Sequence, residues 1–382
     1  MQSKLLLKLL FQLASFLNYY SVLYIAILFF IFKKSVFASE IFLIISLASI
    51  FTHGFSANLR NIYLGSRKLI DIKKITSIRL IIAAVSFVIS NTLVIYFFND
   101  KFLLINSIFI LLVFANWIQE LIIARLEKTE IFSIIHFINQ LFFYVFSTIF
   151  IYFDLRLFLI FLILFYIGAN ILMFRKIFIE SLINIKFLKK IMFKKLNLDI
   201  GFLSTILKTF VNFYWRFIII FFIGKESASF LFIGFMLGSF FGTLFDISYG
   251  SYFLKKVKNK NLFINSIFII YLFIILAFLY FVKQYSNYNE EQFQILVKTT
   301  FYSIIGSYFM VTALRARQQL YELISYRRIC YKMDIYIQIM NLVFIPLIYY
   351  LNKDYLAISY LLSSTFFYLM YKAFDLNVIN KL

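Results

Sequence analysis

Long apolar runs alternate with short polar connections along the whole chain. A helix needs about twenty apolar residues to cross the hydrocarbon core of a bilayer, whereas the strands of a membrane barrel alternate polar and apolar positions over about ten. The runs here are continuous and of the longer kind, so the pattern predicts an all-α, polytopic integral membrane protein with about twelve transmembrane helices. The predicted spans are residues 14–32, 39–57, 78–98, 102–123, 131–153, 157–174, 201–223, 228–250, 262–282, 294–314, 334–351 and 355–373.

Composition supports a lipid environment and narrows the chemistry. The chain of 382 residues is 63% hydrophobic and 14% charged, while a soluble domain is about half apolar and a quarter charged. One cysteine, Cys330, and two histidines, His53 and His136, exclude a disulfide framework and leave little for a metal centre or a catalytic triad. The sequence also lacks a phosphate-binding P-loop. We therefore expect no enzymatic activity and no cofactor.

The net charge of +21 would suggest a nucleic-acid partner if the protein were soluble. In a membrane protein the positions of the cations are informative, because cytoplasmic loops are rich in Lys and Arg. With the N-terminus inside, 28 of the 38 cations fall in cytoplasmic segments and 7 on the opposite side. This bias predicts that both termini are cytoplasmic. It also explains the positive charge through membrane topology, so we expect contact with membrane lipids and no nucleic-acid partner.

The longest connection that this topology places in the cytoplasm is residues 175–200, in which basic residues alternate with Ile, Leu and Phe. Such a pattern is typical of an amphipathic helix on the inner leaflet. The connection separates an N-terminal half, 1–174, from a C-terminal half, 201–382. The second and eighth spans both end with a glycine, a polar stretch and an aromatic-Leu close before a basic loop. We therefore expect two pseudo-symmetric bundles of about six helices, with a substrate path between them.

Three polar residues of the span 201–223 are the main candidates for a binding site. Lys208, Asn212 and Arg216 recur at every fourth position, so they share one face of a helix. Lys208 and Arg216 are about 12 Å apart along the axis, which places Arg216 well inside the bilayer. Cations on an inward stripe would attract an anion such as a phosphate or a uronic acid, so we predict that this face binds substrate. The alternative is that Lys208 snorkels to the surface and Arg216 pairs with a structural carboxylate.

Four further residues near the inner ends of spans are candidates. The carboxylates Glu120 and Asp246 could form gating salt bridges at the cytoplasmic mouth, or they could take up a coupling proton or cation. Asn58 and Arg60 end the second span and are predicted to bind substrate. Their alternative role is a helix end with an inside-positive anchor.

The stretch Gly54–Leu64 reads GFSANLRNIYL and is followed by Arg67, Lys68 and a charged amphipathic run into the next span. It is similar to the end of the second helix in the multidrug/oligosaccharidyl-lipid/polysaccharide flippase superfamily. In the arrangement of its spans and basic loops, nearly the whole chain resembles the Wzx-like polysaccharide transporters of that superfamily. It departs from them in its short outward loops and in having only one proline and ten glycines.

The resemblance implies a flippase of the bacterial inner (plasma) membrane that works by alternating access. Its substrate would be a lipid-linked oligosaccharide, namely a polyprenyl-pyrophosphate-linked repeat unit of an O-antigen or capsule. The sugars would occupy a cavity between the halves while the lipid tail stays in the bilayer, and polysaccharide-assembly proteins are possible partners. Arg216 and Lys208 match the type of cationic lining that such a cavity uses.

Two other functions stay open on the sequence. A drug or small-molecule exporter of the same architecture would have an acidic cavity, whereas the spans of this chain hold more cations than acids. A membrane-embedded polysaccharide polymerase or glycosyltransferase would need a sizeable outward loop or a cluster of catalytic groups in one loop. The largest outward connection, around Gln284–Gln292, has only about ten residues.

Overall fold

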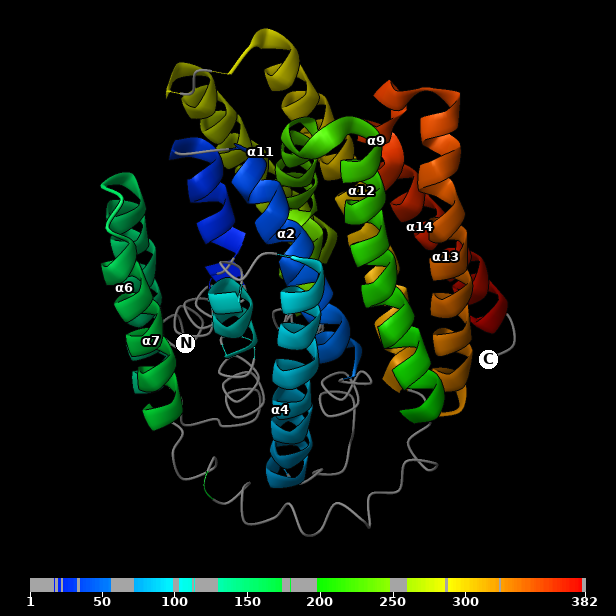
Figure 1. Ribbon diagram of the computed structural model, residues 1–382. Helices are drawn as coiled ribbons and strands as arrows, with labels where there is room; N and C mark the ends of the chain where they lie inside the picture. Colours follow the sequence, from blue (N-terminus) through cyan, green and yellow to red (C-terminus); the bar gives the residue numbers. More distant parts are fainter. Residues whose placement is uncertain are drawn as a thin grey trace. The chain divides into compact units, whose positions relative to one another are not determined.

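In the residues that it describes, the computed structural model is built almost entirely of helices (Figure 1). It describes residues 17, 20, 21, 23–32, 35–55, 72–98, 103–111, 113, 130–173, 179, 198–247, 260–285, 288–322 and 324–379. Residues 23–32 and 103–111 form short helices. The longer elements are α2 (Ser35–Ser49), the π-helix η1 (Ile50–Gly54), α4 (Ile72–Phe97), α6 (Glu130–Tyr152), α7 (Arg156–Met173), α9 (Leu198–Ile247), α11 (Lys260–Tyr285), α12 (Glu290–Glu322), α13 (Ile324–Leu351), the 3-10 helix η5 (Lys353–Ile358) and α14 (Ser359–Ile379).

Six helices in the described part of the chain are long and apolar enough to cross a membrane. Large apolar side chains are exposed along these helices and along α6 and α7, as expected for surfaces that face lipid tails instead of water. The protein is therefore an all-α, multi-pass membrane protein, which confirms this part of the predicted fold class. The six candidate spans are Val36–Gly54, Ser77–Phe97, Ile200–Thr243, Ile264–Gln284, Glu290–Ala313 and Arg328–Leu351.

Helix α9 is twice as long as one crossing requires. Its apolar segment Ile200–Thr243 has 44 residues, or about 66 Å at 1.5 Å per residue, against a hydrocarbon core of about 30 Å. Gly224 divides it, with φ 80° and ψ 165°, a backbone conformation that only glycine adopts readily. Figure 1 shows α9 turning back on itself there. The sequence predicted two separate spans with a break after residue 223, and the kink confirms that break.

The chain forms two compact units. Unit 1 comprises Met1–Leu28 and Ile41–Phe213, and unit 2 comprises Phe29–Glu40 and Tyr214–Leu382. The predicted linker 175–200 lies outside the described residues except for 179 and 198–200. The division into 1–174, 175–200 and 201–382 therefore stays a prediction.

Polar side chains join helices inside unit 1. Between α4 and the helix 103–111, the Asn106 amide donates to the Asn91 carbonyl oxygen at 2.7 Å and the Asn91 amide donates to the Ser107 hydroxyl at 3.0 Å. Ser90 donates to Asn106 Oδ1 at 3.0 Å. Each member uses another as its partner, as polar groups between membrane helices must when no water is available. The network fixes this helical hairpin.

The part of α9 that follows the kink, residues 225–247, is called its second limb. Small residues bring this limb close to α12 in unit 2. Gly234, Gly238 and Gly242 recur at every fourth position of α9, and a Cβ added at any of them would meet a Ser or Thr of α12. At Gly238 that Cβ would lie 2.2 Å from the Ser303 Cβ and 2.7 Å from the Thr300 carbonyl oxygen. Backbones can approach this closely only where side chains are absent, which is the basis of the G-x-x-x-G packing motif.

Helix α12 is also packed closely on a second side. A Cβ added at Gly306 would lie 3.1 Å from the Leu361 Cα and 3.0 Å from the Tyr360 ring of α14. Close packing against both α9 and α14 makes α12 the central helix of unit 2. Since no hydrophobic effect drives helices together in lipid, this fit of surfaces supplies much of their association.

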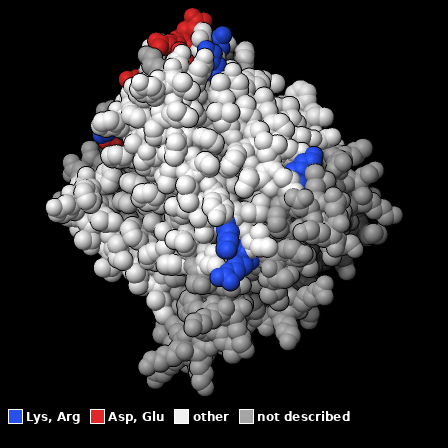
Figure 2. All heavy atoms as spheres, turned by 90° about the vertical axis from the view of Figure 1, so that its right-hand side faces the viewer, with Lys and Arg blue, Asp and Glu red and all other residues white. Residues whose placement is uncertain are grey.

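The end of unit 2 where α9 turns and α12 begins is polar. Lys225 Nζ donates to Glu40 Oε1 at 2.7 Å, and the side chains of Glu226, Glu290 and Glu291 are exposed. Figure 2 shows uncharged side chains over most of the described surface on one side of the molecule, with acidic side chains gathered at the top of the view. Acidic residues on this side therefore collect at a helix end, where a spanning helix meets water.

Hydrogen bonds, one of them from a tyrosine, join the segments at this polar end. The Tyr288 hydroxyl, between α11 and α12, donates to the Phe30 carbonyl oxygen, and the Gln292 amide donates to Glu226 Oε1 at 2.9 Å. Burial, and then the nearby Glu226 carboxylate, raises the pKa of Tyr288 well above its ordinary value. The phenol therefore keeps its proton and its role as a donor.

The close approach of α9 and α12 gives a prediction. Gly238→Ala should lower the free energy of unfolding in detergent by about 1–3 kcal/mol, because the new methyl group overlaps Ser303 and Thr300. Gly242→Ala is the matched control, since its Cβ would lie 3.4 Å from the nearest atom of Ser307, an ordinary contact. Equal stability of the two variants would show that the approach at Gly238 is not tight.

Candidate functional site

The part of α9 that precedes the kink, residues 198–223, is called its first limb. It carries the predicted binding residues Lys208, Asn212 and Arg216. The Lys208 and Asn212 side chains are exposed, and that of Arg216 is half-buried. Asn212 lies about 18 Å along the helix from Ile200, where the apolar segment begins, and so near the middle of this limb. A lysine could extend its ammonium group toward a membrane surface, but the short side chain of Asn212 has no such reach.

The same limb has a second exposed face of opposite character. Phe210, Phe217 and Phe221 are 43%, 50% and 75% exposed. At 3.6 residues per turn they lie nearly opposite the stripe of Lys208 and Asn212. Phenylalanine rings suit lipid, whereas an exposed amide at this depth requires water or protein partners. This part of α9 therefore exposes aromatic rings on one face and a lysine and an amide on the other.

The threonines beside the stripe have a packing role. Thr205 and Thr209 are buried, and the Thr205 hydroxyl donates to the Gly54 carbonyl oxygen of η1 at 2.6 Å. A Cβ at Gly54 would lie 2.8 Å from Thr209 Oγ1 and 3.3 Å from the Ile206 Cα. These threonines thus pack α9 against η1. The exposed polar stripe begins next to that contact.

A hydrogen bond fixes the rotation of the limb farther along. Trp215 Nε1 donates to the Asn341 carbonyl oxygen of α13 at 2.9 Å. Phe222 stacks on Tyr349 of the same helix, with ring centroids 3.9 Å apart and planes 8° apart. These contacts hold the segment of α9 that carries Arg216 in a defined orientation within unit 2.

The other predicted site residues fall where the structure describes no side chains. Asn58, Arg60 and Glu120 lie outside the described residues, and Asp246 falls in the last turn of α9 but its side chain also lies outside what is described. Their proposed roles in substrate binding, gating or coupling stay predictions.

A buried ion pair in unit 2 is a candidate that the sequence reasoning missed. Arg317 Nη2 of α12 donates to Asp334 Oδ2 of α13 at 2.5 Å, and both side chains are about nine-tenths buried. The Tyr371 hydroxyl of α14, itself fully buried, lies 2.6 Å from Asp334 Oδ1 and 3.2 Å from the Cys330 carbonyl oxygen. One carboxylate thus joins three helices.

Arg79 and Arg317, two of the 28 cations that the predicted topology counts as cytoplasmic, are buried and lie in helices. Arg317 follows the predicted span 294–314, and α12 continues past it to Glu322. Arg79 lies in α4 and is only 2% exposed. A helix can continue past its apolar run when a partner from elsewhere in the chain accepts the charge, and the spacing of residues does not reveal that partner. The orientation with both termini in the cytoplasm stays a prediction.

Two polar features of the described residues bear on binding and on packing. No group of three or more His, Cys, Asp or Glu side chains that could hold a metal ion occurs in the described part of the chain. One polar feature is the exposed stripe on α9, which can contact an anion, and the other is the buried Asp334 cluster, which holds helices together. Comparisons with protein-family models, with curated proteins and with solved structures find no match to this chain.

The Asp334 cluster gives a prediction about stability. Asp334→Asn leaves the buried Arg317 without its counter-charge, so it should lower the free energy of unfolding by about 3–5 kcal/mol. Tyr371→Phe removes one hydrogen bond and should cost about 1 kcal/mol. The measurement is unfolding of the purified protein in detergent.

Two further variants separate charge burial from other effects. Asp354→Asn changes an exposed carboxyl group and should stay within about 0.5 kcal/mol of the wild type. The double variant Arg317→Met with Asp334→Leu should regain most of the stability lost in Asp334→Asn, because no unpaired charge is then buried. A double variant as unstable as the single one would contradict this explanation.

Proposed function

We propose that the protein is a flippase that moves a lipid-linked oligosaccharide across the bacterial inner membrane by alternating access. In this proposal about twelve spans form two six-helix bundles with both termini in the cytoplasm. The substrate is a polyprenyl-pyrophosphate-linked repeat unit of an O-antigen or capsule polysaccharide. The resemblance of the sequence to the Wzx-like transporters motivates this choice of substrate.

The exposed Asn212 is the observation that carries the proposal. A short amide side chain is accessible in the middle of a spanning limb, on the side opposite the exposed rings of Phe210 and Phe217. Hydrocarbon does not hydrogen-bond to an amide, so this face is best explained as the wall of a water-filled cavity. A transporter needs such a cavity, whereas a membrane scaffold does not.

Charge favours an anionic substrate for this cavity. Lys208 is exposed on the same face one turn from Asn212, and Arg216 follows one turn later. Ammonium and guanidinium groups form strong charge-assisted hydrogen bonds with phosphate and carboxylate oxygens. The pyrophosphate of a lipid-linked oligosaccharide, or an acidic sugar in it, is therefore the expected ligand. A cationic drug would be repelled.

Polar residues outside the described part complete the proposal. Arg60 and Asn58 would extend the cationic lining at the cytoplasmic end of the second span. Glu120 and Asp246 would form gating ion pairs that open and close the cytoplasmic mouth, or would carry the coupling proton or cation. Polysaccharide-assembly proteins would supply the substrate and take up the product.

The test is translocation of a lipid-linked oligosaccharide in proteoliposomes, read as its accessibility to an added glycosidase. Lys208→Ala and Arg216→Ala should each lower the rate about tenfold or more, because each removes a charge-assisted contact with the anion. Lys208→Arg should retain most of the activity, since the charge is kept.

Lys283→Ala is the matched control, because Lys283 is also exposed but lies in the last turn of α11. It should leave the rate within about twofold of the wild type, as expected for a surface substitution. Wild-type rates in Lys208→Ala and Arg216→Ala would refute the assignment of this face to substrate. A wild-type protein that accelerates no translocation would refute the proposed function itself.

A further inference from the structure

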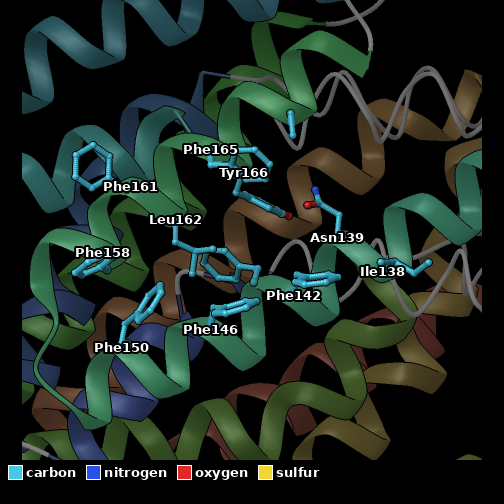
Figure 3. Close-up of a pocket in the computed structure, with 12 residues that line it drawn as sticks. Ile138, Asn139, Phe142, Phe146, Phe150, Phe158, Phe161, Leu162, Phe165 and Tyr166 are labelled. Carbon is cyan, nitrogen blue, oxygen red and sulfur yellow. The ribbon is translucent and has the colours of Figure 1, made fainter.

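A groove lined by aromatic rings runs between α6 and α7 in unit 1 (Figure 3). Its volume is about 700 Å³. The two helices form a hairpin with a tight turn at 153–155. Each helix contributes one row of rings at helical spacing, so both rows face the same groove. The rows are Phe142, Phe146 and Phe150 on α6, and Phe158, Phe161 and Phe165 on α7.

The rings form a continuous lining that reaches the turn. Phe142 and Phe146 are stacked, with centroids 5.6 Å apart and planes 9° apart, and Phe150 follows at 5.8 Å from Phe146. The rings of Phe150 and Phe158 have centroids 5.7 Å apart, so the two rows of rings are in contact near the turn of the hairpin. Packing of side chains alone would have buried such rings, but Phe161 is 67% exposed.

The surroundings of the groove restrict what can fill it. Both helices belong to a multi-pass membrane protein and expose apolar side chains over most of their length. An apolar groove of this size would not hold ordered water, because its walls offer water almost no polar partners. In a multi-pass membrane protein, hydrocarbon chains are the expected solvent for exposed apolar faces of this kind, and rings that they cover are removed from contact with water.

Polar side chains close the end of the groove that is far from the turn. The Gln140 amide donates to the Tyr166 hydroxyl, and the Tyr166 ring packs on the buried Phe143 at 4.8 Å between centroids. Figure 3 shows the Asn139 amide and the Tyr166 hydroxyl pointing toward one another at this end. A hydrocarbon chain that enters from the turn side would stop here, because burying these polar groups against methylenes is costly.

The length of the groove matches one leaflet. From Phe150 to Asn139 the axis of α6 rises about 16 Å, and half of a hydrocarbon core of about 30 Å is about 15 Å. The groove begins one turn from the hairpin connection, so it spans the leaflet in which that connection lies. A fatty acyl chain is about one leaflet long, whereas a polyprenyl chain is much longer.

We propose that this groove binds one acyl chain of a phospholipid from the leaflet that contains the α6–α7 turn. The chain lies between the rows of rings, with its ester end near the turn and its methyl end at Asn139 and Tyr166. The lipid is a bound component of the hairpin and is distinct from any transported substrate, so this inference does not rest on the proposed function.

The test uses a phosphatidylethanolamine with a photoreactive diazirine in one acyl chain, incorporated into vesicles with the purified full-length protein. After illumination, mapped peptides of α6 and α7 should be labelled about tenfold more than those of α4, whose exposed side chains sample the general lipid environment. A photoreactive polyprenyl phosphate is examined in parallel and should show no such preference for the groove.

Leu162→Trp should reduce the labelling of α6 and α7 to the level of α4, because Leu162 lines the groove and the larger ring would fill it. Leu164→Trp is the matched control, since Leu164 lies on the same helix, is exposed and is not part of the lining; it should keep the wild-type labelling. If Leu162→Trp does not accumulate in the membrane, Ala169→Phe fills the polar end of the groove instead.

Two results would overturn the proposal. One is labelling of α6 and α7 at the level of α4, unchanged in the groove-filling variant, which means that lipids only pass over the groove. The other is preferential labelling by the polyprenyl phosphate, which means that the occupant is an isoprenoid chain. Neither result bears on whether the protein moves oligosaccharides, because that activity is measured separately.

Discussion

Polar groups inside a bilayer must find their partners within the protein or in a water-filled cavity, and the structure follows from this constraint. Between α4 and the helix 103–111, two asparagines and two serines bond to one another. In unit 2, the Asp334 carboxylate accepts hydrogen bonds from an arginine and a tyrosine. Asn212 is different, because it is exposed in the middle of a spanning limb. We therefore expect this residue to serve the function of the protein and not the packing of its helices.

The same solvent explains how the helices associate. Lipid tails are as apolar as leucine, so burial of apolar side chains does not by itself drive helices together. Close fit between the helix surfaces has to supply the association. The glycines of α9 and the serines and threonine of α12 supply that fit in unit 2, and Gly306 supplies it toward α14. Where the fit is incomplete, as in the groove between α6 and α7, lipid is the available filler.

Apolar periodicity predicts the helices well, because a spanning helix is specified by its own composition. The described helices fall on the predicted spans, and the break within α9 falls where the charged and small residues around Gly224 interrupt the run. Contacts between distant segments were not predictable in this way. The pairing of Arg317 with Asp334 joins charges from two helices, and Thr205 bonds to a backbone carbonyl far away in the sequence. The spacing Gly234, Gly238, Gly242 was a readable signal that was missed.

The central claim is that the face of α9 carrying Lys208 and Asn212 borders water and the opposite face borders lipid. Cysteine accessibility tests it most directly, since the native Cys330 is fully buried and should contribute little background. In membranes, Asn212→Cys should react with a charged, membrane-impermeant thiol reagent, while Phe210→Cys, two positions away on the other face, should not. Absence of reaction at Asn212→Cys, or equal reaction at both positions, would contradict the account.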